Sequence, residues 1–195
     1  MSDGLGYKRR QRVPDPAVLN AADQYEEAAE VLWDVPPELG ISLPFMNCTM
    51  IAIELYLKSL ASALEFRRAE GEFGELGLST VHSRPDAKKH DFDTLLKAMP
   101  EHVRKDLLAA FAAWPENEAK PFLEWCAPYN RLFMDSRYPF EHGARMSGLT
   151  FDRLRAFLTF LKNFVHHYPI QEWVDVEHAG QTFRVVAPLG DKPQT

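Results

Sequence analysis

The stretch LPFMNCTMIAIELYLKSLASALEF, from Leu43 to Phe66, is the longest and most evenly apolar segment of the chain. One helical stripe in it consists of residues spaced alternately three and four apart: Met50, Ile53, Leu57, Leu60 and Leu64. A second apolar stripe lies beside the first. A helix that is apolar on most sides is buried on most sides. We therefore expect a central helix here, ending near Glu70 and Gly71, on which the rest of the chain packs.

Only Glu54 and Lys58 interrupt the apolar surface of this helix. Their spacing of four, with the acid first, favours an ion pair along the helix. The pair has two interpretations. If it faces the core, it holds the helices in register; if it faces a cleft, it belongs to a polar binding site.

Length and composition indicate a single domain that is neither secreted nor embedded in a membrane. The chain has 195 residues, enough to bury a core without disulfides. The two cysteines, Cys48 and Cys126, fall inside predicted helices and are expected to be reduced, buried thiols. No apolar run reaches the roughly 18 residues of a membrane span. We expect a cytoplasmic protein.

The net charge of −6 argues against a broad surface for binding duplex nucleic acid. Two short basic runs, Lys8–Arg12 and Lys88–His90, leave a local phosphate-binding patch open. For the terminal run, a solvated tail is the simpler interpretation.

The pattern predicts an all-α fold, a bundle of five to six helices with a small C-terminal β-hairpin. Residues 1–14 form a flexible basic tail, 15–169 the bundle, and 170–195 the hairpin and a tail. Asp15 and Pro16 begin the first helix, and Asp91 or Asp93 caps the third. The longest irregular connection covers residues 71–89.

Further along the chain, a helix over residues 121–136 is expected to kink near Ala127, because Pro128 removes a backbone donor. Thr150 is expected to cap the last helix, whose inward stripe includes Leu154, Leu158 and Val165. The hairpin comes next, over residues 173–186.

Arg137 and His142 form the most suggestive short motif for chemistry. Histidine can take the proton from a ribose 2′-hydroxyl or pass one to the leaving oxygen, while guanidinium stabilises the negative charge that grows on the phosphorane. The pair could therefore cleave RNA without a metal. Alternatively, Arg137 neutralises an acid or a helix end and His142 is solvated.

Three segments, in this order, carry a resemblance to a known family: IAIELYLKSL (residues 51–60), KHDFDTLL (residues 89–96) and YNRLFMDSRYP (residues 129–139). With the amphipathic helix after them, they resemble the HEPN superfamily over residues 20–168. The resemblance implies an up-and-down helical bundle, commonly a homodimer. Such proteins occur in toxin–antitoxin and phage-defence systems and beside nucleotidyltransferases, and the active members are metal-independent ribonucleases.

On this resemblance, Arg137 and His142 are the candidate catalytic pair, and Glu54, Lys58, Tyr138 and Lys89 are the candidate substrate-binding residues. Tyr138 and Pro139 give the RYP form, which resembles the branch that acts as partner-binding or nucleotide-binding modules.

The sequence supports three candidate functions. The first is a module that binds an antitoxin or nucleotidyltransferase partner, a nucleotide or an RNA end near Arg137. The second is an endoribonuclease, and the third a structural interaction domain. No cofactor or metal is expected, because His90 and Asp91 fit the start of a helix better than a metal pair.

Overall fold

The central helix, α2 (Ser42–Ser59), is buried on nearly every side. Ala52, Ile53, Tyr56 and Leu57 each have no solvent-exposed area. The structure is a computed structural model that describes residues 6–67, 80–85, 91–130, 151–178 and 181–186. Within that part of the chain, α2 has the central position expected of it.

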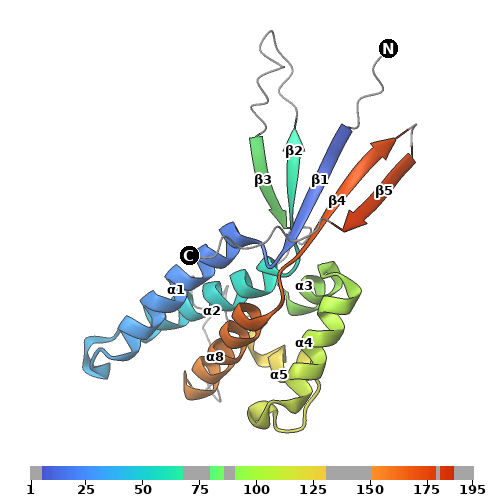
Figure 1. Cartoon of the computed structure of the whole chain (residues 1–195). Helices are drawn as coiled ribbons and strands as arrows, with labels where there is room; N and C mark the ends of the chain where they lie inside the picture. Colours follow the sequence, from blue (N-terminus) through green and yellow to red (C-terminus); the bar gives the residue numbers. More distant parts are fainter. Residues whose placement is uncertain (1–5, 68–79, 86–90, 131–150, 179–180, 187–195) are drawn as a thin grey trace, which may run out of the picture.

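The described helices together build a mostly helical fold, which confirms that part of the prediction (Figure 1). The α-helices are, in chain order, α1 (Pro16–Trp33), α3 (Phe92–Ala98), α4 (Glu101–Ala113), α5 (Phe122–Cys126) and α8 (Phe151–His167). The 3-10 turns are η1 (Pro37–Leu39), η3 (Pro115–Asn117) and η4 (Ala127–Tyr129). Helices α1, α3 and α8 pack against α2.

The α1 helix lies antiparallel to α2, because the start of one meets the end of the other. The Asp15 backbone N–H donates to the Ser59 carbonyl at 2.8 Å. The Asp15 side chain caps α1 by accepting from the backbone N–H groups of Ala17 and Val18, at 3.0 and 3.2 Å. The predicted start of the first helix is confirmed.

Aromatic side chains fill the core between α4, α5 and α8. Phe157 of α8 lies 4.6 Å from Trp125 and 6.3 Å from Phe111, measured between ring centroids. Phe111 in turn meets Phe122 at 5.0 Å. Tilted and edge-on contacts of this kind add about 0.5–1.5 kcal/mol each beyond the buried area.

A five-stranded antiparallel sheet extends from one end of the bundle, in the order β3-β2-β1-β4-β5 (Figure 1). The strands are β1 (Gly6–Val13), β2 (Ser62–Arg67), β3 (Thr80–Pro85), β4 (Gln171–His178) and β5 (Gln181–Val186). The predicted C-terminal hairpin is confirmed as β4 and β5, but it forms only part of this sheet.

The sheet corrects three expectations. Residues 6–13, predicted to lie in a flexible tail, form the central strand β1. The central helix ends at Ser59 rather than near Glu70, because the chain turns at Leu60 to enter β2 beside β1. The connection over 71–89, predicted to be irregular, contains β3.

Smaller corrections concern single helices. The helix predicted over 121–136 is α-helical only as far as Cys126 and continues as the turn η4, where Pro128 interrupts the ladder. The remainder of that helix and its predicted end lie outside the described residues, as does Thr150.

The loop after α4 holds two non-glycine residues in the left-handed region. Glu118 and Ala119 have φ values of 57° and 56°. Buried Asn117 fixes this loop: its amide donates to the carbonyls of Phe111 and Ala112, and its side-chain oxygen accepts from the Ala119 N–H at 2.6 Å. Two carbonyl groups at the end of α4 thus gain hydrogen-bond donors, and the backbone of Glu118 and Ala119 is strained in return.

Ala119→Gly is expected to raise the free energy of unfolding by about 0.5–1 kcal/mol, because glycine removes the steric cost of positive φ. Urea denaturation measures the change. Ala109→Gly, at an exposed position inside α4, is the matched control and should lower stability by about 1 kcal/mol. Equal destabilisation by both substitutions would contradict the proposed strain.

Candidate functional site

The one site that the sequence predicted and the structure describes is the Glu54–Lys58 pair on α2. Lys58 Nζ forms an ion pair with Glu54 Oε1, and the two side chains are only 15% and 11% exposed. The predicted pair is confirmed. Because removing charges from water is costly, an enclosed pair needs close contact and further compensation from its surroundings.

Asn47 extends this pair into a polar stripe. It precedes Glu54 by seven residues, two helical turns, so that Asn47, Glu54 and Lys58 share one face of α2. The stripe lies beside Met50 and Leu57, which are buried. We call these three residues the α2 polar stripe. It combines a carboxylate, an ammonium and an amide on an otherwise apolar helix.

The remaining predicted site residues, Lys89, Arg137, Tyr138 and His142, lie outside the described residues. Their distances from Glu54 and Lys58, and from one another, therefore stay predictions. The last described residues before Arg137 belong to η4 and Asn130, whose side-chain oxygen accepts from the Phe92 N–H at 3.2 Å. That contact holds Asn130 against the first turn of α3.

Arg153, near the start of α8, is a site residue that the sequence did not indicate. Its guanidinium lies 4.6 Å from the centroid of the Trp125 ring, and Nη1 lies 3.3 Å from Glu118 Oε1. Its Nε is buried and has no acceptor among the described residues. In the sequence, the only indication of these contacts was the position of Arg153 beside the expected start of the last helix.

Two side chains near Arg153 are unsuited to act as nucleophiles. Burial raises the pKa of the Cys126 thiol well above its usual range, even though Arg153 opposes the shift. Burial likewise raises the pKa of Tyr129. Cys126 is accordingly a buried thiol, as predicted, and Cys48 is partly buried.

A ladder of ion pairs joins α1 to α8. Lys162 Nζ donates to Glu26 at 2.8 Å, and the Arg155 guanidinium binds both carboxylate oxygens of Glu30, at 3.0 and 2.5 Å. The hydrogen bond and positive charge of Arg155 lower the pKa of Glu30.

At one end of the ladder, Asp23 accepts hydrogen bonds from two sides. His166 Nε2 and the Tyr56 hydroxyl each lie 2.8 Å from Asp23 Oδ1. Burial and the hydrogen bond to Asp23 raise the pKa of Tyr56, so the phenol stays protonated and acts as a donor. His166 lies in the last turn of α8, so this contact joins the end of α8 to α1.

Other possible sites are limited within the described chain. No group of three histidine, cysteine, aspartate or glutamate side chains lies together there in a way that could hold a metal ion. Asp91 caps α3 by accepting from Thr94 N–H at 2.8 Å, as predicted. None of the described helices is both long enough and apolar enough to cross a bilayer.

No protein-family model, curated protein or solved structure matches this chain. The resemblance to the HEPN superfamily therefore stays a prediction, and the function of the chain has to be inferred from the described geometry.

Lys58→Met is expected to lower the free energy of unfolding by about 2–3 kcal/mol, because it leaves the Glu54 carboxylate enclosed without its ammonium partner. The double variant Glu54→Leu, Lys58→Met should recover much of that loss. Urea denaturation measures both.

The matched control is Lys105→Met. It breaks the Glu101–Lys105 pair, which has the same spacing but side chains that are 68% and 72% exposed, so its effect on stability should be much smaller than that of Lys58→Met. A double-variant loss equal to the sum of the two single losses would contradict the enclosed pair.

The free energy of unfolding should fall in acid partly because Glu30 becomes protonated. Because its pKa is lowered in the folded protein, its stabilising contribution is present above the pKa of an unfolded glutamate and is lost as pH falls through the folded value. Glu30→Gln should flatten the decline in stability below about pH 5. Denaturation midpoints across acid pH measure the slope, and the exposed Glu27→Gln should leave it unchanged.

Proposed function

We propose that this chain is a HEPN-like helical module that holds the phosphate of a nucleotide or an RNA end near Arg137, beside the α2 polar stripe. The observation that carries the proposal is the enclosed Glu54–Lys58 pair. It lies within the segment IAIELYLKSL and places two charges on a helix that is otherwise mostly apolar and buried.

The pair suits a structural support for a phosphate-binding arginine. Arginine binds phosphate through a planar fork, and it does so best when a carboxylate holds its orientation. Glu54 is the carboxylate proposed to face Arg137, with Lys58 limiting the negative charge.

The biological setting belongs to the proposal as well. A HEPN-like module of the RYP form is expected to work as a homodimer in a defence or toxin–antitoxin system. Its protein partner would be an antitoxin or a nucleotidyltransferase. Neither role requires the chain itself to break a phosphodiester bond.

The test is binding of a short fluorescein-labelled single-stranded RNA, and of ATP, measured by fluorescence anisotropy and calorimetry. Arg137→Ala should weaken binding about tenfold or more, which is the loss of one charge-assisted contact. Arg104→Ala, on the surface of α4, removes the same charge elsewhere and should have little effect. Failure of the wild type to bind either probe would overturn the proposal.

A parallel incubation of the protein with unlabelled RNA in EDTA distinguishes the binding module from the ribonuclease. The module leaves the RNA intact. A metal-independent ribonuclease would leave 2′,3′-cyclic phosphate ends and would lose activity in His142→Ala. Cleavage that disappears in this variant, while its thermal unfolding is unchanged, would replace the module by the enzyme.

A further inference from the structure

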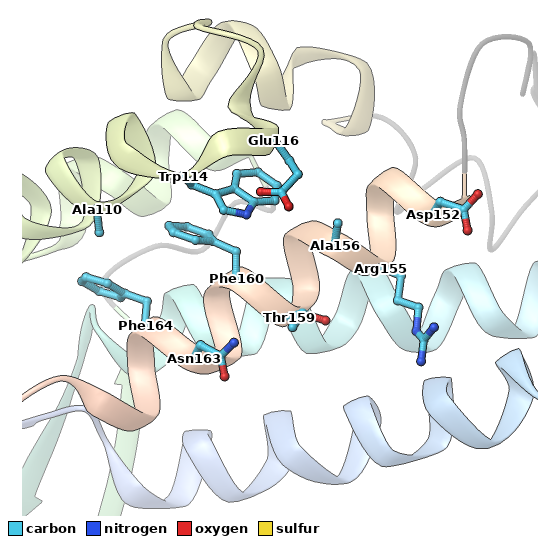
Figure 2. Close-up of a pocket in the computed structure, with 10 residues that line it drawn as sticks. All are labelled: Ala110, Trp114, Glu116, Asp152, Arg155, Ala156, Thr159, Phe160, Asn163 and Phe164. Carbon is cyan, nitrogen blue, oxygen red and sulfur yellow. The ribbon is translucent and has the colours of Figure 1, made fainter.

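A groove lies between the end of α4 and the outer face of α8 (Figure 2). Its volume is about 520 Å³, within the range of about 300–1,000 Å³ that is usual for ligand sites. We call it the α4–α8 groove. It is open to solvent and lined by side chains from both helices and from the loop between α4 and α5.

The floor of the groove is an aromatic ladder. The Trp114 and Phe160 rings stack at 5.0 Å with an interplanar angle of 26°, and Phe160 stacks on Phe164 at 6.5 Å with the same angle. All three side chains are only partly buried. The aromatic core of the bundle thus reaches the surface here, and covering it would release apolar area from water.

One wall of the groove is flat enough to admit another helix. Ala156, Thr159 and Asn163 are spaced three and four apart, so they occupy one face of α8. Thr159 and Asn163 are exposed. Their side chains are short, which permits close approach of a second backbone, and both can form hydrogen bonds.

The charge around the groove is negative. Among the described residues that line it, Arg155 is the only cation, and its guanidinium already binds both carboxylate oxygens of Glu30. Asp34 and Asp152 add to the negative charge that raises the pKa of Arg155. Glu116 and Asp152 stand at the rim, exposed, and neither forms an ion pair within the described residues. An anionic ligand is disfavoured here and a cationic one is favoured.

We propose that the α4–α8 groove binds a basic amphipathic helix of a partner protein. Apolar side chains spaced three and four apart on that helix would cover Trp114, Phe160 and Phe164. Lysine or arginine side chains on its flanks would meet Glu116 and Asp152. This inference goes beyond the proposed phosphate site, because it concerns a groove lined by other residues and a ligand of opposite charge.

The experiment selects random phage-displayed peptides against the full chain and then measures one selected synthetic peptide by calorimetry. Selected sequences should be rich in lysine and arginine and carry aromatic or aliphatic residues three and four apart. Asn163→Arg places a long cationic side chain in the groove and should weaken binding about tenfold or more. Asn20→Arg, at an exposed position of α1, is the matched control and should bind as the wild type does.

The outcomes are distinguishable. Asp152→Asn should weaken the selected peptide and reduce the dependence of its affinity on salt, while thermal unfolding of each variant verifies that the fold is retained. Failure to select any peptide, selection of acidic peptides, or equal binding by Asn163→Arg would overturn the proposal. Conversion of a dimer to a monomer by Asn163→Arg would also overturn it, because the groove would then belong to a second copy of this chain.

Discussion

The structure depends on the burial of α2, although this helix carries an ion pair on its surface. Helices α1 and α8 lie alongside α2 and satisfy each other's charges through Glu26, Glu30 and their partners (Figure 1). The Glu54–Lys58 pair, by contrast, lies within α2 itself and is largely buried. An enclosed pair adds little to stability over an apolar pair of similar size, but it penalises arrangements that separate the two charges. The pair therefore supports one register of the bundle, and its Glu54 is the carboxylate that we propose faces Arg137.

The junction between bundle and sheet is the second constraint. Strands β1, β2 and β4 all begin or end within a few residues of a long helix, and the Asp15 N–H to Ser59 carbonyl bond joins two of these transitions. At the third, His102 Nε2 lies 2.6 Å from the Gln171 side-chain oxygen, and the Tyr168 hydroxyl donates to Asp106 at 2.9 Å. The sheet is thus attached to one end of the bundle, while the α4–α8 groove is built wholly from helical elements and the loop after α4.

The sequence patterns predicted those features that depend on interactions between residues close together in the chain. The Asp15 and Asp91 caps, the hairpin and the Glu54–Lys58 pair each depend on residues a few positions apart, and each was found. Strand β1 was missed because its basic sequence gives no strand pattern, and its partners in β4 lie at the other end of the chain. The helix end at Ser59 was missed because Leu60 and Leu64 continue the helical stripe, whereas Leu64 and Phe66 fit a strand equally well. The Arg155–Glu30 contact spans 125 residues, and no spacing rule predicts it.

The central claim is that Arg137 faces the Glu54 carboxylate, and a double-mutant cycle on the free energy of unfolding tests it most directly. The variants are Glu54→Gln, Arg137→Met and the two combined. If the guanidinium and the carboxylate are in contact, the combined loss should differ from the sum of the separate losses by about 1 kcal/mol or more. Additive losses would contradict the claim and would remove the proposed phosphate site from the face of α2.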